Sequence, residues 1–174
     1  FRPPRSPQEK ATVRARLGLP RDVPVVLFVG FFSKDKGPHR VIEAWLQARE
    51  RGAHSFLVLV GSTDTRYVEI DGALVTGVRQ LMANPLCRDD VRLVEHTLEM
   101  EAYYQAADLF VLPSLREGCP LSLLEAMATG LPCVVSRLPG ATDVLIEHDV
   151  NGVLIPIGDV EALTRNIVAL IQEP

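Results

Sequence analysis

The feature that most constrains the fold is a regular alternation of short apolar runs with segments of helical periodicity. The runs are four to seven residues long, rich in valine and leucine, and apolar at successive positions. Such runs are typical of strands buried on both faces, as in a parallel sheet covered by helices. The alternation therefore predicts βαβ units with right-handed crossovers, and hence a doubly wound, Rossmann-like α/β fold.

The expected elements follow from these runs and from helix start and stop signals. The first helix has Ser6 as N-cap, Glu9 at the capping-box position and Gly18 as terminator. We expect a linker and lead-in helix over 1–22 and one domain over 23–174. The expected strands are 24–30, 55–61, 91–94, 109–112, 132–135 and 152–155. The expected helices are 7–17, 38–51, 73–83, 99–106, 121–129, 142–147 and 160–172.

Composition narrows the function classes. The 174 residues are 47% hydrophobic and carry a formal net charge of −4, with lysines and arginines scattered along the chain. A basic patch for nucleic acid or for an anionic membrane surface is therefore not expected. No apolar stretch approaches the roughly 18 residues of a membrane span. We expect a soluble protein whose only membrane contact is through another domain.

The cysteines and the first residues bear on compartment and domain boundaries. Cys87, Cys119 and Cys133 are odd in number and lack C-x-x-C spacing, which favours reduced thiols in a cytoplasmic protein over disulfides or a zinc site. The opening FRPPRSP has the proline content of a linker and no initial methionine. A fragment that starts at a domain boundary is therefore expected.

Two strand-exit loops are the candidate ligand-binding segments, because ligands of doubly wound sheets bind beyond the carboxyl ends of the strands. They are GFFSKDKG (30–37) and PSLREGCP (113–120). Neither has the G-x-G-x-x-G of a dinucleotide site or the order of a P-loop. Lys34 and Lys36 nevertheless place two ammonium groups beside a helix N-terminus, which suits a diphosphate. The alternative is a solvated charged loop.

The helix after the second loop carries one carboxylate on an otherwise apolar surface. At about 100° per residue, Ser122, Glu125 and Thr129 share one stripe, and leucine, alanine and methionine cover the rest. We expect this helix to be buried almost all round, with Glu125 facing a polar cleft or water. There it has few partners within the domain and can accept hydrogen bonds from a vicinal diol such as ribose. An exposed glutamate on an ordinary helix is the alternative.

The spacing E-x7-E, from Glu117 to Glu125, lies within LFVLPSLREGCPLSLLEAMATGLPCVVS. That stretch resembles the signature of retaining glycosyltransferases of the GT-B fold, of the group 1 or family four type. Other segments resemble the same family in order: VVLFVGFFSKDKG, FLVLVGS, YYQAADLFVLPS and LPGATDVLIEHDVNGVLIPIGDVEAL. The family has two Rossmann-like domains with the active site between them, and this chain resembles only the C-terminal, donor-binding one.

The resemblance implies a role for each matching residue. Lys36 would contact the diphosphate of a UDP- or GDP-sugar, Glu117 would lie beside the transferred sugar, and Glu125 would bind the ribose. Lys36 and Glu117 are the implied catalytic residues. No cofactor or metal is implied, and the acceptor would bind to an N-terminal domain, so the isolated domain is expected to be inactive. The implied donor-binding set is Gly30, Lys34, Lys36, Glu117, Gly118, Cys119, Pro120, Leu121 and Glu125.

Three positions depart from the family pattern: Phe31 where arginine is common, Glu95 where glycine is common, and Asp143 where glutamate is typical. We expect Lys34 to supply the phosphate-binding charge that is missing at Phe31. That position also keeps open a second hypothesis, a degenerate module that binds a nucleotide or a protein partner without catalysis. A third, another GT-B enzyme such as a sugar-nucleotide epimerase, is disfavoured by E-x7-E.

Overall fold

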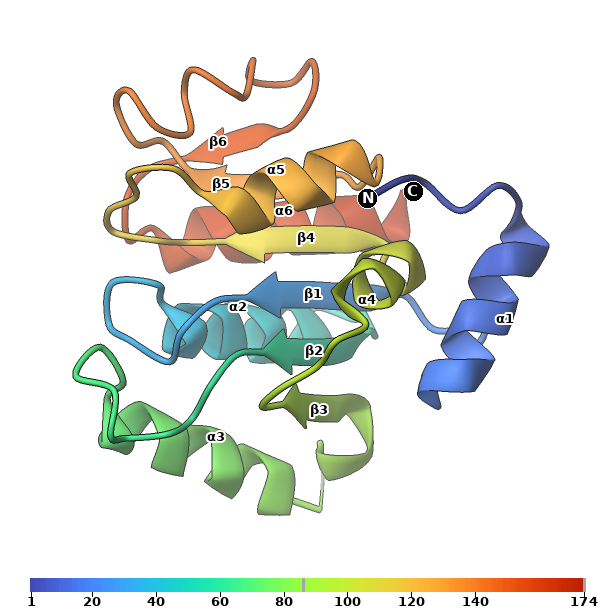
Figure 1. Ribbon diagram of the computed structural model, residues 1–174, viewed down its shortest axis with the longest axis horizontal. Helices are drawn as coiled ribbons and strands as arrows, with labels where there is room; N and C mark the ends of the chain where they lie inside the picture. Colours follow the sequence, from blue (N-terminus) through green and yellow to red (C-terminus); the bar gives the residue numbers. More distant parts are fainter. Residues whose placement is uncertain (86, 174) are drawn as a thin grey trace.

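The protein is described by a computed structural model, which covers residues 1–85 and 87–173. Within these residues the fold is built on a six-stranded sheet in the order β3-β2-β1-β4-β5-β6 (Figure 1). All neighbouring strands run parallel, which confirms the predicted doubly wound α/β fold. The strands are β1 (Val25–Val29), β2 (Phe56–Val60), β3 (Val91–Val94), β4 (Leu109–Leu112), β5 (Cys133–Ser136) and β6 (Val153–Ile155).

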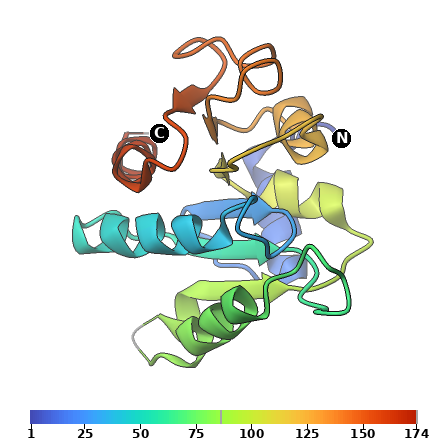
Figure 2. The same ribbon diagram turned by 90° about the vertical axis from the view of Figure 1, so that its left-hand side faces the viewer.

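Helices cover both faces of the sheet. α2 and α6 pack side by side on one face, with α3 next to α2, and α4 and α5 lie on the other (Figures 1 and 2). The strands are apolar at successive positions because both of their faces are covered, and β2 is buried along its whole length. The helices are α1 (Pro7–Leu17), α2 (Pro38–Glu50), α3 (Gly72–Ala83), the short 3-10 helix η1 (Arg88–Asp90), α4 (Met100–Ala106), α5 (Leu121–Ala128) and α6 (Val160–Gln172).

The lead-in helix α1 is part of the same packed structure. The Ser6 hydroxyl accepts a hydrogen bond from the Glu9 N–H at 3.2 Å, and Gly18 ends the helix with φ of 64°, as the sequence predicts. The Arg2 guanidinium and the Arg5 amide hold the pKa of Glu9 at about 2. Val13 of α1 lies in the hydrophobic core, and α1 packs on α4. The division at residue 22 stays a prediction.

The expected helix over 142–147 is wrong. The chain there forms turns, with one helical hydrogen bond from the Ile146 N–H to the Thr142 carbonyl at 2.9 Å. The Asn151 side chain takes backbone groups of this segment: its Oδ1 accepts from the Glu147 N–H at 2.8 Å, and its Nδ2 donates to the Leu145 carbonyl at 3.2 Å. Such side-chain hydrogen bonds compete with helix formation. The other expected elements end within one residue of their observed bounds.

Candidate functional site

The carboxyl ends of the parallel strands lie at one edge of the sheet, on the left in Figure 1. The strand order reverses there between β1 and β4, which is the usual ligand position in such sheets. The β1–α2 loop (30–37), the β2–α3 loop (61–71) and the β4–α5 loop (113–120) line a cleft of ≈ 960 Å³ at this point. Of the predicted site residues, Lys34, Lys36, Glu117 and Gly118 line the cleft.

The two predicted ligand loops are tied to each other. The Leu115 N–H donates to the Asp35 carbonyl at 2.7 Å, and the Arg116 guanidinium contacts the Asp35 carboxylate at 2.6 Å. Gly37 has φ of +74°, and a Cβ there would lie 2.9 Å from the Pro113 carbonyl oxygen. Glycine at this position therefore allows the two loops to approach closely.

Lys36 and Glu117 form an ion pair inside the cleft. The Lys36 ammonium lies 2.7 Å from both carboxylate oxygens of Glu117, and the Ser114 hydroxyl donates to the same carboxylate at 2.7 Å. The Glu117 side chain is only 4% exposed, whereas that of Lys36 is 29% exposed. The sequence places these two residues on separate loops, and the fold brings them into direct contact. A buried carboxylate of this kind depends on its partners.

Two further cations border the cleft. Lys34 is largely exposed and lies 3.4 Å from Asp71, whose pKa is lowered by the Ala73 N–H at the start of α3 and by Lys34 itself. Arg116, which no sequence pattern singled out, also lines the cleft and is 82% exposed. Phe31, at the position where arginine was expected, lines the same cleft with half of its surface exposed. The cleft around Phe31 therefore holds cations, but each of them is paired with a carboxylate of the same cleft.

The Glu125 carboxylate has a hydrogen-bond partner within the domain, on α4. The Tyr104 hydroxyl on α4 donates to Glu125 Oε2 at 2.8 Å. Tyr104 is fully buried, and a buried tyrosine hydroxyl almost always finds a hydrogen-bond partner. The sequence signal was the pair Tyr103 and Tyr104, of which only the second faces inward completely. Glu125 itself is half-buried.

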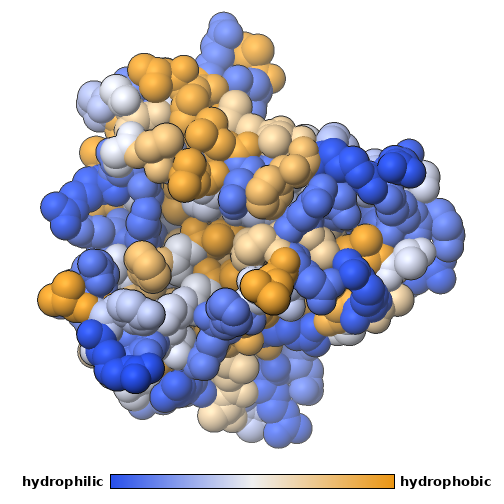
Figure 3. All heavy atoms as spheres, in the orientation of Figure 1, coloured by the Kyte–Doolittle hydropathy of each residue, from blue (hydrophilic) through white to orange (hydrophobic). Residues whose placement is uncertain are grey.

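The expectation that α5 is buried almost all round is wrong. Leu123 and Ala126 are fully buried, but Leu121 is 65% and Leu124 is 37% exposed. Only one side of α5 packs against β4 and β5. In Figure 3, hydrophobic residues gather on the part of the surface where Figure 1 places α5. An apolar surface of this kind is typical of an interaction site.

The start of α5 shows which backbone groups are available to a ligand. Pro120, the N-cap residue, has no N–H, and the Leu121 N–H donates to the Cys119 carbonyl at 2.9 Å. Gly118 has open space around the position of a Cβ, so the fold itself does not require glycine there. The amides of Gly118 and Cys119 are therefore the better candidates for ligand contact.

Gly30 packs against the chain where it leaves β2. Its N–H donates to the Val60 carbonyl at 2.9 Å. A Cβ on Gly61 would lie 2.0 Å from the Gly30 carbonyl oxygen, so the backbones of the two exits touch at these glycines. This contact gives Gly30 a structural role, and a role in ligand binding stays a prediction.

Glu95 and Asp143, the other two positions that depart from the family pattern, each contact groups nearby. The Glu95 carboxylate accepts from the Thr63 hydroxyl and lies 3.4 Å from the Arg79 guanidinium, beside a separate hollow of ≈ 590 Å³. The Asp143 carboxylate accepts from the Gly140 N–H at 2.7 Å and so closes that turn. Both side chains are thus engaged by groups within the domain.

These features define a Rossmann-like domain with a ligand cleft at its switch point. The family model described as "Glycosyl transferases group 1" matches residues 9–174, and the chain belongs to that family. The amylovoran biosynthesis glycosyltransferase AmsK of Erwinia amylovora is 35% identical over 155 residues, which are 84% of this chain and 36% of the relative.

Solved structures of glycosyltransferases share the fold. A sucrose-phosphate synthase from Thermosynechococcus elongatus matches with a TM-score of 0.80 at 31% identity, over 100% of this chain and 41% of that one. HepE of Anabaena, in complex with UDP-glucose, matches with a TM-score of 0.82 at 25% identity, over 97% of this chain and 44% of that one. The chain thus spans less than half the length of these relatives.

In residues 1–85 and 87–173, no helix is long and apolar enough to cross a membrane. In the same part of the chain, no three His, Cys, Asp or Glu side chains gather as a metal site requires.

Proposed function

We propose that this chain is the donor-binding domain of a retaining glycosyltransferase that moves a sugar from a UDP- or GDP-sugar to an acceptor. The observation that carries the proposal is the Lys36–Glu117 ion pair, 2.7 Å long, within the switch-point cleft. HepE, which shares the fold, is bound to UDP-glucose. We infer that the enzyme retains the anomeric configuration because the segment from Glu117 to Glu125 resembles the signature of retaining enzymes.

The proposed roles use the charges of the cleft. Lys36 leaves Glu117 and binds the donor diphosphate, and the freed Glu117 carboxylate accepts hydrogen bonds from the sugar. Lys34 and Arg116, which are paired with Asp71 and Asp35 in the structure, are the further cations that can turn to the phosphates in place of a charge at Phe31. As the sugar is transferred, negative charge builds up on the departing diphosphate, and preorganised cations and amide donors stabilise it. No metal is proposed in this step.

The acceptor site belongs, in this proposal, to a second domain that faces the cleft and the exposed leucines of α5. The isolated chain then binds the donor nucleotide but transfers no sugar. We place the enzyme in the cytoplasm, where nucleotide sugars are its substrates. A longer chain that includes the facing domain should turn over a donor and keep the anomeric configuration of the sugar, which NMR of the product measures.

The second candidate function is a nucleotide- or partner-binding module without catalysis. The exposed Phe31 ring in the cleft favours it, because this position carries no charge for the phosphate. Donor hydrolysis separates the two. Release of UDP from UDP-glucose by the longer chain supports the enzyme, whereas tight binding of UDP without any release supports the module.

UDP or GDP is expected to stabilise the chain in the presence of EDTA. At a nucleotide concentration of about 100 times Kd, the gain in unfolding free energy is about 2.7 kcal/mol. For a domain of this size that corresponds to a rise in melting temperature of about 5–10 °C. Differential scanning fluorimetry measures the shift. If neither nucleotide raises the melting temperature at millimolar concentration, the donor-binding proposal fails.

Alkylation of cysteine offers a test of where the nucleotide sits. Cys119 is exposed, whereas Cys87 and Cys133 are buried, and burial raises the pKa of the Cys133 thiol to about 12. Iodoacetamide is therefore expected to label Cys119 first, which mass spectrometry of peptides detects. Saturating UDP-glucose should slow this labelling by about tenfold or more, since only the ligand-free fraction reacts. Unchanged labelling at saturation would place the donor away from the start of α5.

A further inference from the structure

Glu125 is held by a hydrogen bond from another helix. Its Oε2 accepts from the Tyr104 hydroxyl at 2.8 Å, and in the part of the chain that the structure describes Oε1 has no hydrogen-bond partner. The carboxylate is therefore half engaged: one oxygen is fixed by the protein and the other is left to accept a hydrogen bond. An unbound glutamate side chain on a helix populates several rotamers, and a single fixed donor selects among them.

Tyr104 is enclosed by its neighbours, which makes it a suitable donor. It is fully buried on α4, and its ring lies 6.0 Å from that of Phe110 on β4. The Phe1 ring meets it edge-on at 5.6 Å from the outer side. Burial, reinforced by Glu125, raises the pKa of the Tyr104 hydroxyl above its ordinary value of 10.0, so the hydroxyl stays protonated and donates.

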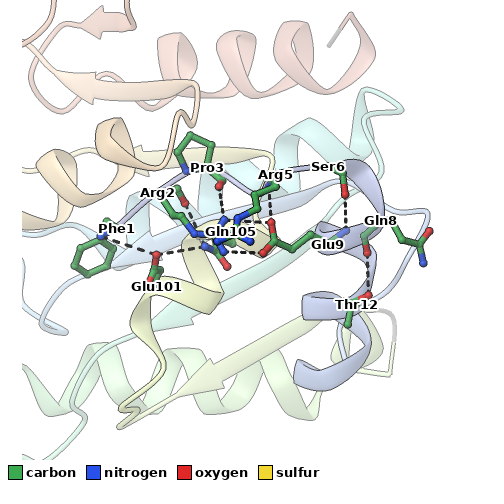
Figure 4. Close-up of polar contacts among 10 residues, drawn as sticks. All are labelled: Phe1, Arg2, Pro3, Arg5, Ser6, Gln8, Glu9, Thr12, Glu101 and Gln105. Carbon is green, nitrogen blue, oxygen red and sulfur yellow. Dashed lines mark hydrogen bonds and ion pairs between the residues drawn. The ribbon is translucent and has the colours of Figure 1, made fainter.

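The N-terminal segment closes the outer side of this arrangement. Phe1 and Arg2 lie against α4, where the Gln105 side chain donates to the Arg2 carbonyl at 3.2 Å (Figure 4). Figure 4 also shows Phe1 beside Glu101 of the same helix. The Tyr104 ring is thus enclosed between β4 and this segment, and water has little access to its hydroxyl. Glu125 is left as the natural acceptor.

We propose that Tyr104 is a positioning residue, which holds the Glu125 carboxylate so that its free oxygen faces the ribose hydroxyls of the donor nucleotide. This inference rests on the proposed function, in which Glu125 binds the ribose. It adds that ribose recognition depends on a residue of α4 that does not touch the nucleotide. The preorganised carboxylate then loses no rotamer freedom when the ligand binds.

The test compares UDP with 2′,3′-dideoxy-UDP, and isothermal titration calorimetry on the full chain gives both values of Kd. The parent protein is expected to prefer UDP. Tyr104→Phe removes the donor but keeps the ring contacts, and should reduce this preference by about three- to tenfold, the range for one hydrogen bond. Binding of the dideoxy nucleotide should hardly change. If Tyr104 had a purely structural role, Tyr104→Phe would instead weaken the binding of both nucleotides equally. That result would overturn the inference.

Two further variants make the test specific. Replacing Tyr104 with p-aminophenylalanine restores a donor at the same place and should restore the preference for UDP. This variant also serves if Tyr104→Phe fails to fold. Its ratio of Kd values for the two nucleotides then has to equal that of the parent, and a lower preference for UDP would overturn the inference. In Glu125→Ala the preference should be lost, and adding Tyr104→Phe should cause no further loss.

The outcomes separate the inference from the proposed function. If Glu125→Ala keeps the full preference for UDP, the ribose role of Glu125 is wrong, and the positioning role falls with it. If Glu125→Ala abolishes the preference but Tyr104→Phe leaves it intact, ribose binding stands and only the positioning role of Tyr104 is overturned.

Discussion

Lys36→Ala is expected to destabilise the protein by about 3 kcal/mol, because it leaves the buried Glu117 carboxylate without its counter-charge. The ammonium contacts both carboxylate oxygens at 2.7 Å, and the Glu117 side chain is 4% exposed. The estimate is at the low end for a buried pair, since the Ser114 hydroxyl still donates and Lys36 is partly exposed. Urea denaturation at neutral pH measures the loss.

The control is the pair of changes Lys36→Ala and Glu117→Gln. It removes both charges while the amide can still accept from Ser114, so most of the lost stability should return. If the single and double variants are equally unstable, the loss comes from something other than the unpaired carboxylate. Glu117→Gln alone should be tolerated better than Lys36→Ala, because the freed ammonium is already 29% exposed and can turn to water.

The same variants distinguish binding of the phosphates from binding of the nucleoside. Lys36→Ala should weaken UDP binding by about 1.5–3 kcal/mol, the range for hydrogen bonds to charged groups. Uridine, which has no phosphate, should bind almost as before. Glu117→Gln should instead tighten UDP binding, because Lys36 no longer has a competing anion. Equal losses for UDP and uridine in Lys36→Ala would show that this lysine does not bind phosphate.

The fold was predictable from sequence because its strands are buried on both faces. Such strands are continuous apolar runs in the sequence. β2 is an example, with five successive buried residues between a helix and a glycine. The segment 142–147 was not predictable in the same way. Backbone groups of Leu145 and Glu147 bond to the side chain of Asn151, which lies outside the segment, in place of a helical partner.

The candidate site was predictable only as far as strand-exit loops and charge reveal it. Lys36 and Glu117 were named from their loops, but their 2.7 Å contact is a product of the strand order. Tyr104 was missed because its hydroxyl meets Glu125 across two helices, α4 and α5, whose packing no local pattern specifies. The exposure of Leu121 was missed for a related reason, since an apolar helix face does not say what covers it.

Gly61→Ala is expected to disrupt the sheet edge that carries the site. A Cβ at Gly61 would lie 2.0 Å from the carbonyl oxygen of Gly30 and 2.9 Å from its carbon, and both are backbone atoms. These atoms cannot move aside, because the Gly30 N–H donates to Val60 and the Gly61 N–H donates to Val94, at 2.9 and 3.0 Å. Relief requires separating β1 from β2, so the loss should reach about 3 kcal/mol or more, the upper end for overpacking.

Gly118→Ala is the matched control, because it adds the same methyl group to a glycine at another strand exit. Apart from its two chain neighbours, no atom of residues 1–85 and 87–173 lies within 4 Å of that methyl, and Gly118 is not among the glycines with positive φ. Its unfolding free energy should therefore stay level or rise by about 0.5 kcal/mol.

If the donor approaches the Gly118 backbone closely, the affinity of Gly118→Ala for UDP-glucose should nevertheless fall by about tenfold, or 1.4 kcal/mol. Thermal melts and titrations of both variants distinguish the two effects. A Gly118→Ala protein that binds the donor as tightly as the parent would remove this glycine from the site, and a stable Gly61→Ala protein would contradict the backbone contact between β1 and β2.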